Sequence, residues 1–212
     1  MSDPLYFRPM KSLAVLVLLA CALAPLPAAR AQTNPDANQT VYTVEVIVFR
    51  NTSGSGGQED WGAKAVARGP DTPDAPVTGR FVRSLPVSEF QLNDIEARLR
   101  NTANYPPIAH FAWQQTASSW GSRAGFTVAK LGGNVQGLSG TIYLEKGTYL
   151  HLGMALDYQA ASPPDSLGAT PGQSFNMRES RRVKYFERNY YDHPAFGVIA
   201  LVTPSKPSTG GR

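Results

Sequence analysis

The stretch GTIYLEKGTYLHLGMALDYQ (140–159) constrains the fold more than any other part of the sequence. Its second half carries an apolar side chain at every second position, at Leu150, Leu152, Met154 and Leu156. A period of two is typical of a β-strand that turns one face towards a core. Lys146-Gly147 supplies a turn between this strand and the one before it. The chain is therefore expected to contain an antiparallel sheet with one buried face.

Further strands are predicted on both sides of this hairpin. The segment VYTVEVIVFR (41–50) is rich in β-branched and aromatic residues and apolar on both faces, which is typical of a buried strand. Other segments with strand character are 108–115, 124–130, 175–191 (one strand or a bent pair) and 196–204. Glu45 is the exception within 41–50, and we expect it to pair with an arginine on a neighbouring strand. The alternative, a general base, has no support from the neighbouring sequence.

One helix is predicted within LPVSEFQLNDIEARLRNTANYPP (85–107). Ser88 and Gln91 have the spacing of a capping box, which would mark the helix start. The helix ends before the Pro-Pro pair. An apolar stripe follows the helical spacing at Leu92, Ile95 and Leu99. The pattern indicates an amphipathic helix that lies on a sheet with its other face exposed.

These elements add up to an α+β fold, a mostly antiparallel sheet of about six strands with one main amphipathic helix packed on it. We expect a single domain over residues 41–204, preceded by a flexible lead-in at 32–40 and followed by a disordered tail at 205–212. Residues 51–83 are rich in Gly, Ser, Pro and Asp. They are predicted to form a long loop in which Trp61 is the one strong apolar anchor.

Residues 1–31 are predicted to be a signal peptide. A short basic start precedes the apolar run SLAVLVLLACALA (12–24), and the small-x-small pattern ARA (29–31) follows it. The run is short for a membrane span. Lipid attachment at Cys21 is the less favoured alternative, because a further apolar stretch and a cleavage site follow it. Cleavage after residue 31 would leave a periplasmic protein with no cysteine and no membrane span.

Patterns for catalysis or nucleic-acid binding are missing from the sequence. The formal net charge is only +4, and there is no P-loop, G-x-S-x-G or H-E-x-x-H. We predict no catalytic residue, no cofactor and no nucleic-acid partner. His110, His151 and His193 could join Asp192 in a zinc site, but no metal-binding spacing links them, so no metal is expected. Asp192-His193-Pro194 is predicted to form a corner between strands, with Asp192 bonding local backbone.

The segment RESRRVKYFERNYY (178–191) favours a binding role, because arginines alternate with aromatic residues along it. Arginine forks recognise carboxylates, and aromatic faces stack on sugars. The alternative is a solvated strand face in which glutamates pair with the arginines. The hypothetical binding residues come from this segment and the polar face of the hairpin: Arg181, Arg182, Arg188, Tyr190, Tyr149 and His151.

Several blocks of the chain together resemble the CsiV family of exported peptidoglycan-binding proteins. They are YTVEVIVFRN, the EDW that ends at Trp61, YPPIAHFAWQQ, GTYLHLGMAL and RRVKYFERNYYDHPAFGVIALVTP. The most specific are YLHL and DHPAFGV, and the resemblance extends over residues 41–204. It implies a periplasmic, non-enzymatic protein that binds peptidoglycan and supports cell-wall synthesis and cell shape. A cell-wall synthase or its lipoprotein activator would be the protein partner.

Two other classes of function stay open from the sequence. A protein-only envelope adaptor would regulate a cell-wall enzyme without contacting glycan. A metal-assisted hydrolase would need the fold to assemble the three histidines. The resemblance assigns no binding residues, so the candidate residues rest on the arginine–aromatic segment and the hairpin alone.

Overall fold

The computed structural model describes residues 39–52, 78–163 and 165–205. All of them lie in one compact unit, Asn38–Arg212. The predicted signal peptide, most of the predicted lead-in, Trp61 and most of the predicted tail lie outside the described residues. The predicted domain boundaries therefore stay a prediction.

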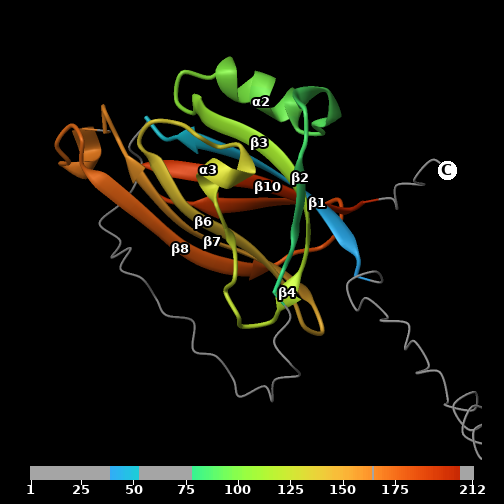
Figure 1. Ribbon diagram of the computed structural model, residues 1–212. Coiled ribbons are helices and arrows are strands. Elements are labelled where there is room, and N and C mark those ends of the chain that lie inside the picture. Colours follow the sequence, from blue (N-terminus) through green and yellow to red (C-terminus); the bar gives the residue numbers. More distant parts are fainter. Residues whose placement is uncertain (1–38, 53–77, 164, 206–212) are drawn as a thin grey trace, which may run out of the picture. The chain divides into compact units, whose positions relative to one another are not determined.

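In the described residues, ten strands form two five-stranded sheets. Figure 1 shows how the sheets are arranged. The first sheet has the order β2 (Phe81–Ser84), β3 (Pro107–Thr116), β1 (Val41–Arg50), β10 (Phe196–Pro204) and β9 (Arg188–Asp192), and every pair is antiparallel. The second has the order β4 (Ser118–Ser119), β6 (Leu138–Lys146), β7 (Leu150–Gln159) and β8 (Ser174–Arg182). In it β5 (Phe126–Thr127) also pairs with β6, and only β4 runs parallel to its neighbour.

The core lies between the two sheets. Along β1, Val44, Val46 and Val48 are fully buried and point into it, because alternate residues of a strand share one face. From the opposite sheet, β7 contributes its own alternating set, Leu150, Leu152, Met154 and Leu156. Each fully buried aliphatic side chain of this kind contributes about 1.5–3 kcal/mol to the stability of the fold. The period-two prediction for the hairpin is confirmed by these buried residues.

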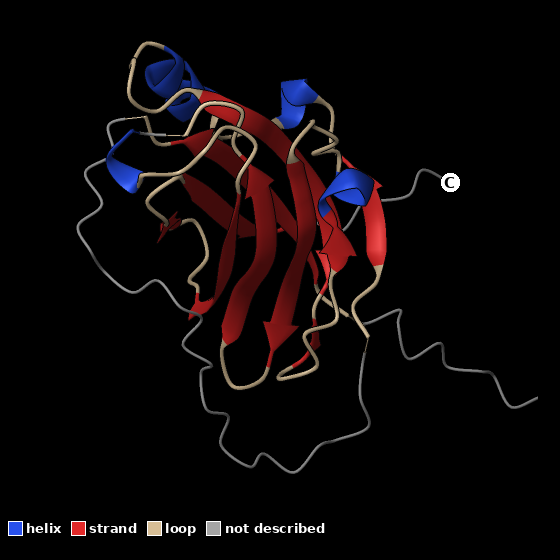
Figure 2. Ribbon diagram, turned by 90° about the vertical axis from the view of Figure 1, so that its left-hand side faces the viewer, coloured by secondary structure: helices blue, strands red, loops and turns tan. Residues whose placement is uncertain are grey.

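The described residues include four short helices. Figure 2 shows helices lying around the sheets. The four are η3 (Val87–Glu89), α2 (Asn93–Arg100), α3 (Val128–Leu131) and η4 (Asp165–Leu167). The longest, α2, lies on the outer face of the first sheet (Figure 1). There Leu92 packs against Ile47 and Leu201, with Ile95 and Leu99 partly buried beside them. The unit is thus layered as helix, sheet and sheet.

The α+β class, the mostly antiparallel pairing and the single main helix are confirmed. The strands outnumber the predicted six, since β2, β4 and β5 are too short to give a pattern in the sequence. They also form two sheets, where one was predicted. The helix start predicted from the capping box was wrong, because Ser88 lies in η3 and α2 begins at Asn93. The strand predicted at 124–130 is only β5, after which the chain turns into α3. The segment 175–191 is a bent pair, β8 and β9.

Candidate functional site

Three of the predicted binding residues gather at the end of the second sheet. The Arg182 guanidinium carbon lies 3.5 Å from the centre of the Tyr149 ring. His151 lies directly opposite Arg182 across the β7–β8 ladder. The His151 ring also contacts the Trp120 ring, at a centroid distance of 3.8 Å. We call Trp120, Tyr149, His151 and Arg182 the Arg182 cluster.

The strand register and one glycine bring the cluster together. Tyr149 belongs to the connection between β6 and β7, and His151 follows as the second residue of β7. Trp120 follows β4, and its backbone N–H donates to the carbonyl of Lys146 at 3.2 Å. A Cβ at Gly147 would lie 3.1 Å from the Trp120 Cβ, so glycine allows this close approach. Trp120 could not be identified as a candidate from the sequence, because no local periodicity marks the segment that contains it.

Among the arginines of β8, Arg182 has no oppositely charged partner in the described part of the chain. Its neighbours on the strand are paired: Arg178 donates to both oxygens of Asp157 at 2.9 and 3.0 Å, and Arg181 forms an ion pair with Glu179. Within the described ranges, Arg182 forms no ion pair. A guanidinium without a carboxylate partner is suited to bind an external carboxylate.

His151 presents a neutral ring to the cluster near pH 7. Burial lowers the pKa of His151 below its ordinary value, and the charge of Arg182 lowers the pKa further, against opposing contributions from the Tyr149 carbonyl and Glu145. Its Nδ1 lies 3.2 Å from the Tyr149 carbonyl oxygen, so the neutral ring donates its proton there. Arg182 is then the positive charge of the cluster; it lies over the Tyr149 ring and opposite His151, whose ring contacts Trp120. Such a surface can bind a carboxylate beside a sugar ring.

Arg181 and Tyr190 lie apart from the cluster and are engaged in internal contacts. Arg181 donates to the Tyr190 carbonyl at 2.7 Å, and its guanidinium carbon lies 5.2 Å from the Tyr191 ring centre. The Tyr190 ring stacks on Phe49, and its hydroxyl donates to Asp192 at 2.8 Å. Burial, followed by the hydrogen bond to Asp192, raises the pKa of the Tyr190 hydroxyl above its ordinary range. These contacts join β8 and β9 to the rest of the fold.

Arg188 lies at a third position, at the start of β9. Its guanidinium is 3.9 Å from the nearest Asp94 oxygen on α2. Downstream, Asp192, His193 and Pro194 lie where β9 turns into β10. Asp192 accepts from the Tyr190 hydroxyl, and His193 Nδ1 accepts from the Ala195 backbone N–H at 3.1 Å. The side chain that bonds to the backbone in this turn is therefore that of His193, whereas the prediction assigned this role to Asp192.

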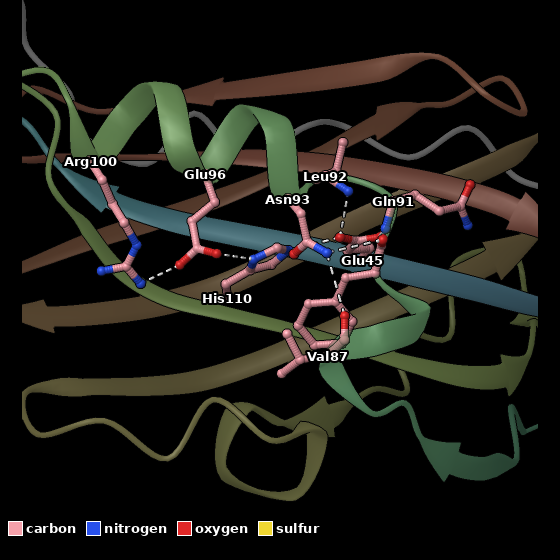
Figure 3. Close-up of polar contacts among 9 residues, drawn as sticks. Glu45, Val87, Gln91, Leu92, Asn93, Glu96, Arg100 and His110 are labelled. Carbon is pink, nitrogen blue, oxygen red and sulfur yellow. Dashed lines mark hydrogen bonds and ion pairs between the residues drawn. The ribbon is translucent and has the colours of Figure 1, made fainter.

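A buried acid–base network beneath α2 is a further feature of the fold (Figure 3). Glu45 is fully buried, and its carboxylate accepts from the backbone N–H groups of Gln91 at 2.7 Å and Leu92 at 2.8 Å. It also lies 2.8 Å from His110 Nε2. His110 Nδ1 lies 2.9 Å from Glu96, which in turn forms an ion pair with Arg100. The prediction that Glu45 pairs with an arginine was wrong, since the partner of Glu45 is His110 on β3.

This network fixes the start of α2 on the sheet. Leu92 has no side-chain cap, and the Glu45 carboxylate supplies that function from β1, where the helix dipole favours a negative charge. Burial opposes protonation of His110, but its bonds to Glu45 and Glu96 outweigh burial and raise the pKa of His110. Glu45, with three partners and no exposed surface, is an anchor of the fold, which argues against a general base.

The three histidines do not meet. His110 lies under α2, His151 in the Arg182 cluster and His193 in the turn after β9. Within residues 39–52, 78–163 and 165–205, no three His, Cys, Asp or Glu side chains are placed to hold a metal ion. In the same ranges, the structure has no helix of the length and apolarity needed to cross a membrane.

Comparisons with known proteins place the chain in a family. No curated protein and no solved structure matches it. The family described as "Peptidoglycan-binding protein, CsiV" matches residues 12–205, which is nearly the whole chain. The predicted resemblance is confirmed, and the chain belongs to the CsiV family of peptidoglycan-binding proteins.

Proposed function

We propose that this protein binds peptidoglycan in the periplasm without cleaving it, and that it thereby supports cell-wall synthesis and cell shape. Membership of the CsiV family supports the ligand and a location outside the cytoplasm. A cell-wall synthase or its lipoprotein activator is the protein partner that we expect. The Arg182 cluster is the surface that we assign to the wall.

The observation that carries this assignment is Arg182 itself. It lies against the Tyr149 ring, which is 48% exposed, and it has no carboxylate partner among the described residues. Peptidoglycan offers carboxylates on its stem peptides, and on lactyl groups from which the stem peptide has been removed, next to flat sugar faces. An arginine fork against an exposed aromatic ring complements both features. The proposal leaves out Arg181 and Tyr190, because both are held by internal contacts.

The test is co-sedimentation of the domain from Gln32 onward with purified sacculi. Arg182→Ala should weaken binding by roughly tenfold or more, since a charge-assisted hydrogen bond contributes about 1.5–3 kcal/mol. Arg178→Ala is the matched control, because it removes the same charge from the same strand at an arginine that is paired with Asp157. Added salt should weaken wild-type binding as well, because it screens the charges at this exposed surface.

Two outcomes would contradict the proposal. Equal sedimentation of Arg182→Ala and wild type would remove the cluster from the binding site. No sedimentation of wild type, together with capture of a cell-wall synthase or its activator, would indicate a protein-only adaptor instead.

A further inference from the structure

A pocket of about 480 Å³ opens on the outer face of the first sheet, beside the start of α2. Its volume lies in the range of small-ligand sites. The residues around it come from three separated parts of the chain and are Gln91, Leu92, Phe186, Arg188 and Leu201. Gln91 and Leu92 are the residues whose backbone N–H groups Glu45 holds (Figure 3). The buried network therefore fixes one wall of the pocket.

The pocket has an apolar floor and an exposed aromatic wall. Leu92 and Leu201 are buried and pack on each other beneath it. Phe186 is 71% exposed, although its backbone donates to the Val202 carbonyl at 3.0 Å. Phe186 also has φ of 64°, a left-handed conformation that is unfavourable for a bulky residue. Strain of this kind is tolerated where the surrounding structure holds it, and it often accompanies binding sites.

Arg188 gives the pocket a cation that the fold leaves largely unbound. Its side chain is 58% exposed, and its closest described carboxylate oxygen, on Asp94, is 3.9 Å away. That carboxylate is also 3.9 Å from Arg98, so two arginines share it. No hydrogen bond joins Arg188 to Asp94 at this distance. The guanidinium can therefore turn its fork of N–H groups to a ligand carboxylate.

Gln91 adds a polar group at a fixed position. Its backbone is held by Glu45 at 2.7 Å, while its side-chain Nε2 makes only a long bond of 3.4 Å to Thr203. The amide oxygen of Gln91 can accept a hydrogen bond from a ligand N–H. The pocket thus combines a carboxylate fork, an amide acceptor and a small apolar floor.

We propose that this pocket binds the carboxylate end of a short peptide with small aliphatic side chains. Arg188 binds the terminal carboxylate, Gln91 accepts from the peptide N–H, and Leu92, Leu201 and Phe186 contact the methyl groups. If the protein binds peptidoglycan, as proposed above, this ligand is the D-alanyl end of a stem peptide. The wall would then be bound at two places, through the Arg182 cluster and through this pocket.

The test is an NMR titration of the ¹⁵N-labelled domain with the dipeptide D-Ala-D-Ala. The Leu92 and Leu201 amides and the Arg188 Nε–H should shift and saturate. The C-terminal amide of the same dipeptide should bind roughly tenfold or more weakly, because it lacks the charge that Arg188 recognises. Arg188→Ala should weaken D-Ala-D-Ala binding to a similar extent. Arg178→Ala is the control and should bind as wild type does, since it removes the same charge from β8 of the second sheet and Arg178 does not line the pocket.

Three results would overturn the inference: no saturable shift at the pocket, equal binding of the amide, or unchanged binding by Arg188→Ala. Tighter binding of L-Ala-L-Ala than of D-Ala-D-Ala would also overturn it, in favour of the C-terminus of a protein. Sedimentation with sacculi, run in parallel, separates the two proposals. If wild type sediments with sacculi but does not bind the dipeptide, the pocket inference fails and the proposed function stands. If it does neither, both fail.

Discussion

At the scale of single residues, Gly153 shows how the outer face of the second sheet is packed. A Cβ at Gly153 would lie 2.1 Å from Cε2 of the Tyr143 ring, which covers this position from the neighbouring strand. Tyr143 is only 6% exposed, so its ring has little room to move away. Glycine within a strand often marks such a close approach.

Gly153→Ala is therefore expected to lower the free energy of unfolding by about 2 kcal/mol or more, the cost of overpacking a filled site. Urea denaturation measures this loss. In a Tyr143→Ala background the ring is gone, and the same glycine substitution should then cost much less. Equal costs in the two backgrounds would show that the ring is not the obstacle.

Residue-level predictions succeeded where alternation determines the environment and failed where partners come from distant strands. The buried set from Leu150 to Leu156 follows from period two. The partner of Glu45 could not be predicted, because it depends on how β3 pairs with β1 over a separation of many residues. Trp120 was missed for a similar reason, since its contact with His151 depends on the path of β4 beside β6.

At the scale of elements, the network under α2 makes the attachment of the helix depend on pH. The pKa of His110 is raised above its ordinary value of 6.5 by Glu45 and Glu96, despite burial. Its contribution to stability is fully present below pH 6.5 and is lost as the pH rises through the raised folded-state pKa. Glu96 has a lowered pKa, so its contribution is present above pH 4.5 and is lost as the pH falls.

We expect the free energy of unfolding to decrease as the pH rises above 6.5, and His110→Gln to remove this decrease. His151 and His193 have lowered pKa values, so their contributions no longer change above pH 6.5. Urea denaturation of wild type and His110→Gln at several pH values from 6.5 to about 8.5, below the range in which tyrosines titrate, measures the effect. The same slope in both proteins would mean that His110 does not carry it.

The helix itself was predictable in part. Its apolar stripe, and the pairs Asp94–Arg98 and Glu96–Arg100, follow from helical spacing. Its start was not predictable, because the cap is a carboxylate on β1 instead of a residue near Ser88. A cap from another element leaves no local pattern in the sequence.

At the scale of the whole described unit, the two sheets share one core and are also joined by a buried hydrogen bond. The Tyr191 hydroxyl, on the first sheet, donates to the Leu152 carbonyl, on the second, at 2.9 Å. Because the core draws residues from both sheets, we expect the two to unfold together.

Tyr191→Phe should lower the free energy of unfolding by about 1–2 kcal/mol, because it removes this buried bond. The unfolding transitions followed by tryptophan fluorescence, to which the fully buried Trp113 contributes, and by far-ultraviolet circular dichroism should shift together. Tyr190→Phe is the matched control on the same strand; its hydroxyl bond is exposed, so the loss should be below about 0.5 kcal/mol. Separate transitions for the two probes would contradict a single cooperative unit.

The sequence allowed the class of the unit to be predicted but not its division into two sheets. Periodicity in the sequence identifies which segments form strands, whereas the pairing of one strand with another depends on long-range contacts. The first sheet, for example, joins β1 to β10 from the two ends of the domain. No local pattern encodes that pairing.

The same pairing has a practical consequence for anyone who handles the protein. The backbone N–H of Ser205, just after β10, donates to the Val41 carbonyl at the start of β1, at 2.8 Å. Tyr42 stacks on Tyr185 in the β8–β9 connection, and Val183 in that connection bonds to Leu150 beside the Arg182 cluster. An affinity tag or sensor surface attached close to either residue 41 or 205 would crowd the cluster. A cysteine introduced by Gln136→Cys, just before β6 and at the opposite end of that strand from Lys146, would instead orient the immobilised protein with the cluster free.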